Sequence, residues 1–145
     1  AAWRRAVNRL GDYEKAWILY CYGEKHTYMN HMLVCEYIWL QMMDRLKGRR
    51  VTDAVMENLI TLVRLVVWNA GQVMREREGA TIFAATYASQ EIGVSAPAWS
   101  QHYKKHWQFM HNKCAELDHI ALENLMRKIK KNAKNGTKKE RICSG

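Results

Sequence analysis

Proline is almost absent from this chain, and the one proline present, Pro97, stands where a helix can begin. In a helix interior proline removes a hydrogen bond and breaks the helix, but in the first turn its missing N–H costs nothing. One proline in 145 residues, together with abundant Leu, Met, Ala, Lys and Arg, favours helices over sheets. The sequence therefore predicts an all-α protein, a helical bundle of one domain.

The residues around Pro97 have the pattern of a helix-turn-helix, which we place over residues 81–107. Gly93 can adopt the positive φ that a tight turn between two helices requires. Val94 would fill the turn, and the hydroxyl group of Ser95 can cap the second helix. An ordinary helical corner is the alternative, because small residues, a glycine and a capped helix also occur together there.

The second helix of this motif has an inward and an outward side. Trp99 and Tyr103 lie one turn apart and would face the interior. The outward residues are small or polar and then basic, as a helix that enters the major groove of DNA requires. The residues that we predict to contact DNA are Ser95, Ala96, Pro97, Ser100, Gln101, Lys104, Lys105 and Lys113.

The polar side chains of this outward face can be given separate roles. Gln101 is a candidate for a bidentate contact with adenine, and Lys104 for a contact with guanine or a phosphate. Lys105 and Lys113 would neutralise backbone phosphates. The small residues at the start of the helix would let it approach the groove closely.

Positive charge is concentrated in the C-terminal part of the chain. Residues 1–94 contain 12 basic and 10 acidic residues, whereas residues 95–145 contain 11 and 4. Most of the net charge of +9 therefore lies in and after the candidate DNA-binding helix, which indicates a polyanionic partner. Within residues 127–141, eight basic residues stand against one acidic residue, either as a solvated face or as contacts to a nucleic-acid backbone. The candidates for such contacts are Arg127, Lys128, Lys130, Lys131 and Lys134.

Apolar periodicity and capping residues predict four helices before the helix-turn-helix. They are Trp3–Leu10, a helix capped by Asp12 and ended by Gly23, Thr27–Lys47, and Asp53–Glu78 with Thr52 as its cap. The third of these is apolar almost all round, which predicts that it is buried. Gly79 would separate this core from the helix-turn-helix.

After Tyr103 the apolar residues recur at spacings of three or four, and both one long helix and two helices broken near Asp118 would fit. The inward positions would be Trp107, Met110, Cys114, Leu117, Ala121 and Leu125. We therefore expect a single helical domain over residues 1–133, with its core in residues 1–79. A basic, flexible tail is expected over residues 134–145.

Histidine and cysteine residues form two groups that could suggest a metal site. His102 and His106 stand at i and i+4, but no third ligand is indicated, so polar histidines near a nucleic acid are the favoured interpretation. A second group has irregular spacing in an apolar setting, which favours core packing, and contains Cys21, His26, His31 and Cys35. We expect no bound metal and no cofactor, and thiols that stay reduced in a cytoplasm.

Other patterns favour ordinary explanations. A run of methionines could be an adaptable partner surface, but core packing is the favoured interpretation for Met29, Met32, Met42 and Met43. The chain contains no Gly-rich phosphate loop, nucleophile elbow or acid–base carboxylate pair, so we predict that it is not an enzyme. It also has no uncharged apolar run of membrane-spanning length, so we expect no membrane partner.

Two N-terminal segments form a distinctive pattern, RLGDYEKAWILYCYG from Arg9 to Gly23 and MLVCEYIWLQM from Met32 to Met42. Their shared features are Ala16-Trp17, Tyr20-Cys21-Tyr22, Cys35 and Ile38-Trp39. In these residues the first third of the chain resembles the late-gene antitermination proteins Q of lambdoid phages, in the branch that includes phage 21. Some unrelated proteins of that name have zinc motifs that this chain lacks, so the resemblance implies no zinc site.

The resemblance implies a transcription regulator that acts in the cytoplasm of a bacterial host. Such proteins recognise double-stranded DNA at a phage late promoter and load onto host RNA polymerase, alone or with a σ factor, at a promoter-proximal pause. They then obstruct RNA hairpins at the exit channel, so that terminators are passed. In that case the basic segment after Arg127 would contact nascent RNA, or DNA outside the groove.

Two other functions fit the same residues. One is a different helix-turn-helix protein, such as a repressor, a σ-like factor or a terminase small subunit, which would have no effect on a downstream terminator. The other is an all-helical adaptor that binds a protein through its Met and Trp residues. In the adaptor the segment 87–105 would be a packed corner, and duplex DNA would be bound without sequence preference.

Overall fold

Every element of the described chain is a helix, which confirms the predicted all-α class. The computed structural model describes residues 2–23, 27–76 and 85–143, and the side chains within residues 2–23, 27–74 and 86–135. The elements are α1 (Ala2–Asn8), α2 (Asp12–Tyr22), α3 (Tyr28–Leu46), α4 (Asp53–Glu76), α5 (Ala85–Glu91), α6 (Ala96–Ala98), the π-helical turn η1 (Trp99–Tyr103) and α7 (Lys104–Cys143).

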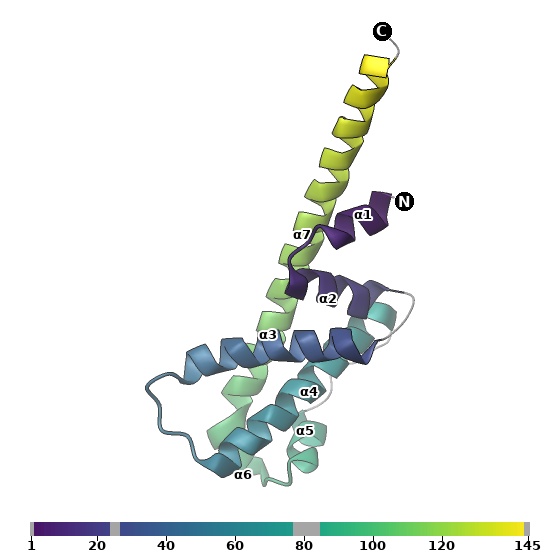
Figure 1. Ribbon diagram of the computed structural model, residues 1–145. Helices are drawn as coiled ribbons and strands as arrows, with labels where there is room; N and C mark the ends of the chain where they lie inside the picture. The colour runs from purple at the N-terminus through teal and green to yellow at the C-terminus, as the bar shows by residue number, and fades with distance from the viewer. Residues whose placement is uncertain (1, 24–26, 77–84, 144–145) are drawn as a thin grey trace.

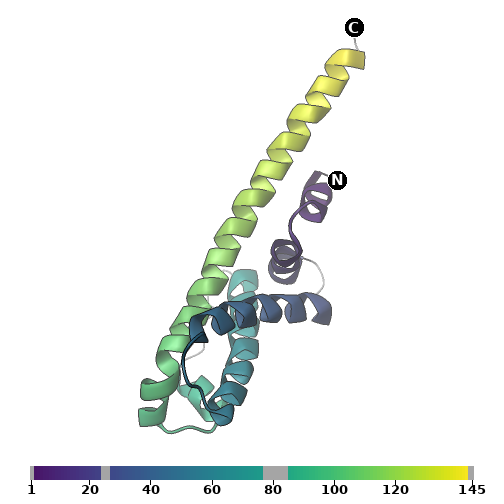
Figure 2. The same ribbon diagram turned by 60° about the vertical axis from the view of Figure 1, so that its left-hand side comes forward.

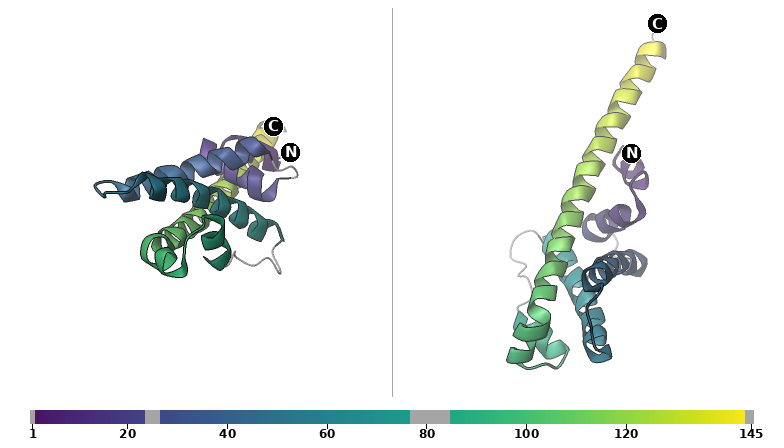
Figure 3. Two further views of the ribbon diagram at one scale, coloured as in Figure 1. Left: turned by 90° about the horizontal axis from the view of Figure 1, so that it is seen from below. Right: turned by 90° about the vertical axis from the view of Figure 1, so that its left-hand side faces the viewer.

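Helix α7, with 40 residues, is the axis along which the other helices are arranged (Figure 1). Helices α1, α2, α3 and α4 each contact it, and they follow one another from its C-terminal half toward its N-terminal end (Figure 3). The last turns of α7 project beyond α1 in each view (Figure 2). Helices α5 and α6 lie at the opposite end, where α7 begins.

The core lies where α2, α3 and α4 face α7. Each of these four helices contributes a fully buried side chain, as shown by Trp17, Ile38, Leu62 and Met110. All six positions predicted to face inward along α7 are buried, namely Trp107, Met110, Cys114, Leu117, Ala121 and Leu125. The apolar spacing of three and four residues therefore identified the buried face of α7 correctly.

Threonine side chains cap α3 and α4, of which the cap at Thr52 was predicted. Thr27 Oγ1 accepts a hydrogen bond from the Asn30 N–H at 3.4 Å, and Thr52 Oγ1 accepts one from the Val55 N–H at 3.3 Å. The prediction that Asp12 caps α2 is wrong, because Gly11 occupies the cap position and Asp12 is the first helical residue. A carboxylate there still stabilises the helix through its dipole.

The prediction that α3 is buried all round is wrong. Val34, Ile38 and Met42 are buried, but one side of the helix is exposed, with Met29 at 67% and Leu40 at 50% of full exposure. Met32 and Met43 are also exposed, so core packing holds for Met42 alone among the four methionines. The neighbouring helices α2, α4 and α7 cover one side of α3 only, and an all-round apolar pattern does not tell which side is covered.

Helix α7 is continuous at Asp118, which decides between the one-helix and two-helix alternatives. The Asp118 side chain is half-buried, and its Oδ1 accepts hydrogen bonds from Trp17 Nε1 at 2.9 Å and Tyr22 Oη at 2.7 Å. The aspartate is therefore an acceptor for α2 and does not cap a second helix.

At the chain's C-terminal end the backbone is helical as far as Cys143, where we expected a flexible tail from residue 134. Lys, Arg and Ala have high helix propensities, which is consistent with an extended last helix. Three predicted features lie outside the described residues: Gly79 as a separator, the last two residues of the predicted fourth helix, and residues 81–84 of the predicted helix-turn-helix. No described helix is both long enough and apolar enough to cross a membrane.

Removal of the Asp118 carboxylate should destabilise the fold. Asp118→Ala leaves the N–H of Trp17 without this acceptor and leaves the O–H of Tyr22 with the weaker acceptor Met74 Sδ at 3.6 Å. The free energy of unfolding should therefore fall by about 2–3 kcal/mol. Asp118→Asn retains an oxygen acceptor and should lose less. Urea unfolding followed by circular dichroism measures both, and equal losses for the two variants would contradict the hydrogen-bonding role.

Candidate nucleic-acid interface

The turn between α5 and α6 has the predicted conformation. Gly93 has a φ of +69°, and a Cβ atom there would meet no atom within 4 Å, so the need for glycine is conformational rather than steric. The Val94 N–H closes the turn by donating to a carbonyl group of α5 at 3.0 Å. Ser95 Oγ accepts from the Ala98 N–H at 3.3 Å, and Pro97 lies in the first turn of α6. A helix, a glycine turn and a capped second helix are thus present.

The π-helical turn η1, which was not predicted, connects α6 with α7. Trp99 and Tyr103 in this turn are buried, as expected, and their ring centroids are 6.2 Å apart. Asn58 Nδ2 donates to Tyr103 Oη at 2.8 Å, which attaches the turn to α4. These contacts determine which side of the second helix faces outward.

Seven of the eight residues predicted to contact DNA are exposed: Ser95, Ala96, Pro97, Ser100, Gln101, Lys104 and Lys105. The eighth, Lys113, has a 25% exposed side chain, and its Nζ lies 3.0 Å from a carboxylate oxygen of Glu116. Its ammonium group is also 5.4 Å from the ring centroid of Phe109. Residues 92–115 contain no acidic residue, so the charged side chains of this stretch are all positive. Among the eight residues predicted to contact DNA, Lys113 therefore has an ion-pair partner within the protein that would compete with a phosphate.

Two arginines that were not predicted as part of the interface lie beside the start of α7. Arg45 in the last turn of α3 donates from Nε to His106 Nδ1 at 3.2 Å, and its guanidinium lies 4.5 Å from the ring centroid of Phe109. The charge of Arg49, in the loop after α3, also acts on His106. That loop lies at the end of the molecule where α5 and α6 are found (Figures 1 and 2). The sequence feature that could have indicated these arginines is the group of four basic residues within 45–50.

The two histidines at i and i+4 differ in environment. His106 is half-buried, and burial, followed by the charges of Arg45 and Arg49, lowers its pKa. His102 is exposed. The described part of the chain contains no group of three His, Cys, Asp or Glu side chains that could hold a metal ion.

The second histidine–cysteine group is a packing contact within its described residues. Cys35 Sγ lies 3.7 Å from His31 Nε2, and burial raises the pKa of the Cys35 thiol to about 11. A thiol with this pKa is protonated at neutral pH. Cys21 is buried, and His26 lies outside the described residues.

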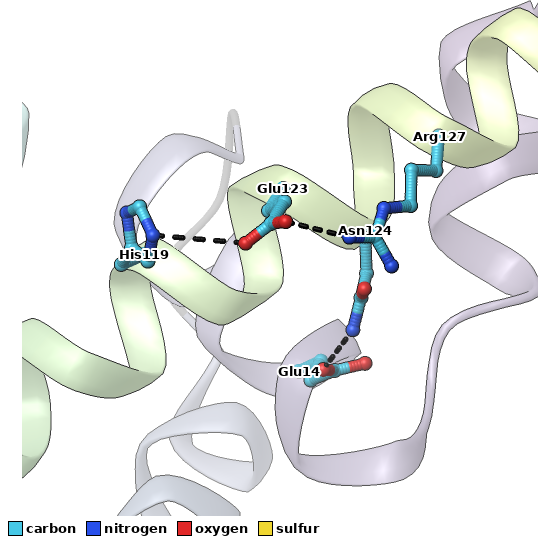
Figure 4. A network of polar contacts seen from close by, with 5 residues as sticks. All are labelled: Glu14, His119, Glu123, Asn124 and Arg127. Atoms are coloured by element: carbon cyan, nitrogen blue, oxygen red, sulfur yellow. Dashed lines mark hydrogen bonds and ion pairs between the residues drawn. The ribbon is translucent and has the colours of Figure 1, made fainter.

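The basic residues of the C-terminal half of α7 lie in different environments. Arg127 forms an ion pair with Glu123 at 2.7 Å, and His119 lies 3.6 Å from the same carboxylate (Figure 4). Lys128 is half-buried. The other three predicted backbone contacts, Lys130, Lys131 and Lys134, are exposed.

These features define an all-α protein with exposed basic side chains near both ends of one long helix. The chain belongs to the phage antitermination protein Q family, whose model matches residues 1–142. It is 27% identical over 128 residues to the antitermination protein Q of Enterobacteria phage 82. That match covers 88% of this chain and 54% of the relative, so the chain spans about half the length of that protein. No solved structure matches the chain. The family expected from the N-terminal segments is confirmed.

Acidification should weaken the attachment of α3 to α7 at His106. Because the pKa of His106 is lowered in the folded state, its contribution to stability is present above its unfolded pKa and is lost as the pH falls through the folded pKa. The free energy of unfolding should therefore decrease below about pH 6.5, the ordinary pKa of histidine. His106→Asn should make this decrease shallower, as measured by urea unfolding across the pH range.

The matched control is His102→Asn, which alters an exposed histidine of η1. We expect this variant to follow the parent at every pH. A decrease of equal steepness in the parent and in His106→Asn would argue against the assigned role.

Proposed function

We propose that this chain is a sequence-specific DNA-binding transcription antiterminator. In this proposal it binds double-stranded DNA at a phage late promoter, loads onto host RNA polymerase at a promoter-proximal pause, and suppresses termination by obstructing RNA hairpins at the exit channel. This is a regulatory function and not an enzymatic one, and it is exercised in the host cytoplasm. Membership of the phage antitermination protein Q family is the observation that supports it most strongly.

The DNA-binding part of the proposal is supported by the exposed face after Gly93. Gln101 and Lys104 point away from the buried side formed by Trp99 and Tyr103, and they are polar side chains of the kind that contact base edges. The N-terminal residues of a recognition helix make these contacts. Arg45 and Arg49, on a neighbouring segment, would add phosphate contacts at the same end of the molecule.

The polymerase-binding part of the proposal is supported by family membership and by the exposed apolar side of α3. Tyr28, Met29, Leu40 and Met43 are each at least 41% exposed. Exposed apolar side chains that gather on one face are typical of protein-interaction sites. The same surface favours the second candidate function, a protein-binding adaptor without DNA specificity. A different helix-turn-helix regulator would bind DNA but would leave termination unchanged.

Selection from a random duplex library at near-physiological salt should enrich one motif. Gln101→Ala should weaken binding to that motif by about 1–3 kcal/mol and leave binding to random duplex nearly unchanged, because the variant can no longer bind a base edge. Gln108→Ala is the matched control, since Gln108 is exposed on the same helix about 10 Å farther from its start. Equal losses of Gln101→Ala on the motif and on random duplex would contradict base recognition.

Lys105→Ala should act differently, by weakening all duplex sequences alike. Removal of one phosphate-binding ammonium group should flatten the dependence of log K on log salt concentration by about 1. Affinities measured by fluorescence anisotropy at several salt concentrations test this. A sequence-dependent effect would instead assign Lys105 to the bases.

Read-through of a terminator distinguishes the three functions. Transcription in vitro, from a promoter followed by the selected motif and a downstream terminator, should give more full-length RNA when the protein is added. Scrambling the motif should remove the effect. A selected motif without read-through would favour another helix-turn-helix regulator, and retention of duplex without any enriched motif would favour the adaptor.

A further inference from the structure

A pocket of about 380 Å³ lies between the α1–α2 junction and the C-terminal half of α7. The lining residues on which the inference depends are Arg9, Glu14, Asn124, Arg127, Lys128 and Lys131. We propose that this pocket binds a backbone phosphate of a single nucleic-acid strand, separate from the duplex contacted by residues 95–105. The inference goes beyond the proposed function, and either can fail while the other holds.

Tertiary packing brings the positive charges of the pocket together from opposite ends of the chain. Arg9 follows α1, whereas Lys128 and Lys131 lie on α7. Arg9 Nη1 donates to Asn132 Oδ1 at 2.7 Å, which holds the guanidinium against α7. The apolar side chains of Ala6, Val7 and Leu10 are buried and fix α1 in place. Three of the four cations belong to the basic run on α7, and the fold adds Arg9 to them.

The two carboxylates near the pocket already interact with other side chains of the protein. The carboxylate of Glu14 accepts a hydrogen bond from Asn124 Nδ2 at 2.6 Å, and Glu123 is engaged by Arg127 (Figure 4). Lys128 and Lys131 take part in no ion pair within the described part of the chain. With four cations and one carboxylate in its lining, the pocket has an excess of positive charge.

A phosphate is the anion that this lining fits. Arginine can donate two parallel hydrogen bonds to phosphate oxygens, and lysine binds phosphate as a point charge. Burial of a phosphate between a guanidinium and two ammonium groups replaces its water contacts with charge-assisted hydrogen bonds.

The position of the pocket favours a strand other than the duplex at the helix-turn-helix. Gln101 and Lys128 are 27 residues apart along one continuous helical path, which corresponds to about 40 Å. If the start of this helix enters a major groove, α7 leads away from the duplex. Proteins that bind single strands use positive charge to follow the backbone and aromatic side chains to stack on the bases, and this pocket would supply a backbone contact alone.

Two double variants with the same loss of charge test the pocket. Lys128→Gln/Lys131→Gln removes two lining residues. Arg4→Gln/Lys47→Gln removes two exposed basic residues that neither line the pocket nor belong to any predicted contact. Fluorescence anisotropy with a labelled oligouridylate should show about tenfold weaker binding for the pocket variant and little change for the control. The slope of log K against log salt should become shallower by about 0.7 for each phosphate that is no longer neutralised.

Arginine variants of the N-terminal segment provide an independent pair. Arg9→Gln should weaken binding of the strand, and Arg5→Gln, which alters an exposed arginine of α1 outside the pocket, should not. Equal weakening by both double variants would mean general attraction by positive charge and would overturn the proposal. Binding of inorganic phosphate without a pocket-dependent effect on the strand would overturn the assignment to a nucleic acid.

The same variants can be measured on the selected duplex, which separates this inference from the proposed function. We expect the pocket variant to retain the affinity of the parent for that duplex, since the lysines changed are remote from residues 95–105. Circular dichroism should show that all four variants are folded. Loss of strand and duplex binding together, in a folded variant, would contradict two separate sites.

Discussion

The hydrogen bonds to Asp118 hold the N-terminal helices against α7, and the arrangement of the other helices depends on them. A half-buried carboxylate needs donors in place of water, and Trp17 and Tyr22 supply them at 2.9 and 2.7 Å. Both donors are on α2, so this helix must cross α7 at the level of Asp118. With α2 fixed there, α1 packs on one side of it and α3 on the other (Figure 1).

An unbroken α7 gives the molecule two basic surfaces at a set distance. The exposed face around Gln101 is held outward by Trp99 and Tyr103, whose contacts include a hydrogen bond from Asn58 on α4. At the other end, the packing of α1 places Arg9 beside Lys128 and Lys131. Under the proposed function and the further inference together, one surface would bind duplex DNA, the other would hold a second strand, and the helix would keep them apart.

Local rules predicted the turn between α5 and α6 and its surroundings well. The φ of Gly93, the cap of Ser95 and the inward direction of Trp99 and Tyr103 depend on neighbouring residues only, and all were predicted correctly. The position of Arg45 beside the start of α7 could not be predicted, because it depends on a contact with His106, which is 61 positions away in the sequence. The π-helical turn has no sequence signal of comparable strength, and the pocket around Arg9 joins segments at opposite ends of the chain.

The sequence by itself determined the helices, most of their ends and the buried face of α7, because capping, propensity and apolar periodicity act over a few residues. It also contained the resemblance in its first third that the family match confirms. Only the tertiary structure decided which side of α3 is exposed, why α7 continues through Asp118, and which basic residues share a pocket. Each of these depends on how the helices pack against one another. A pattern of apolar residues predicts that one face of a helix will be buried, but it does not show which helix covers that face.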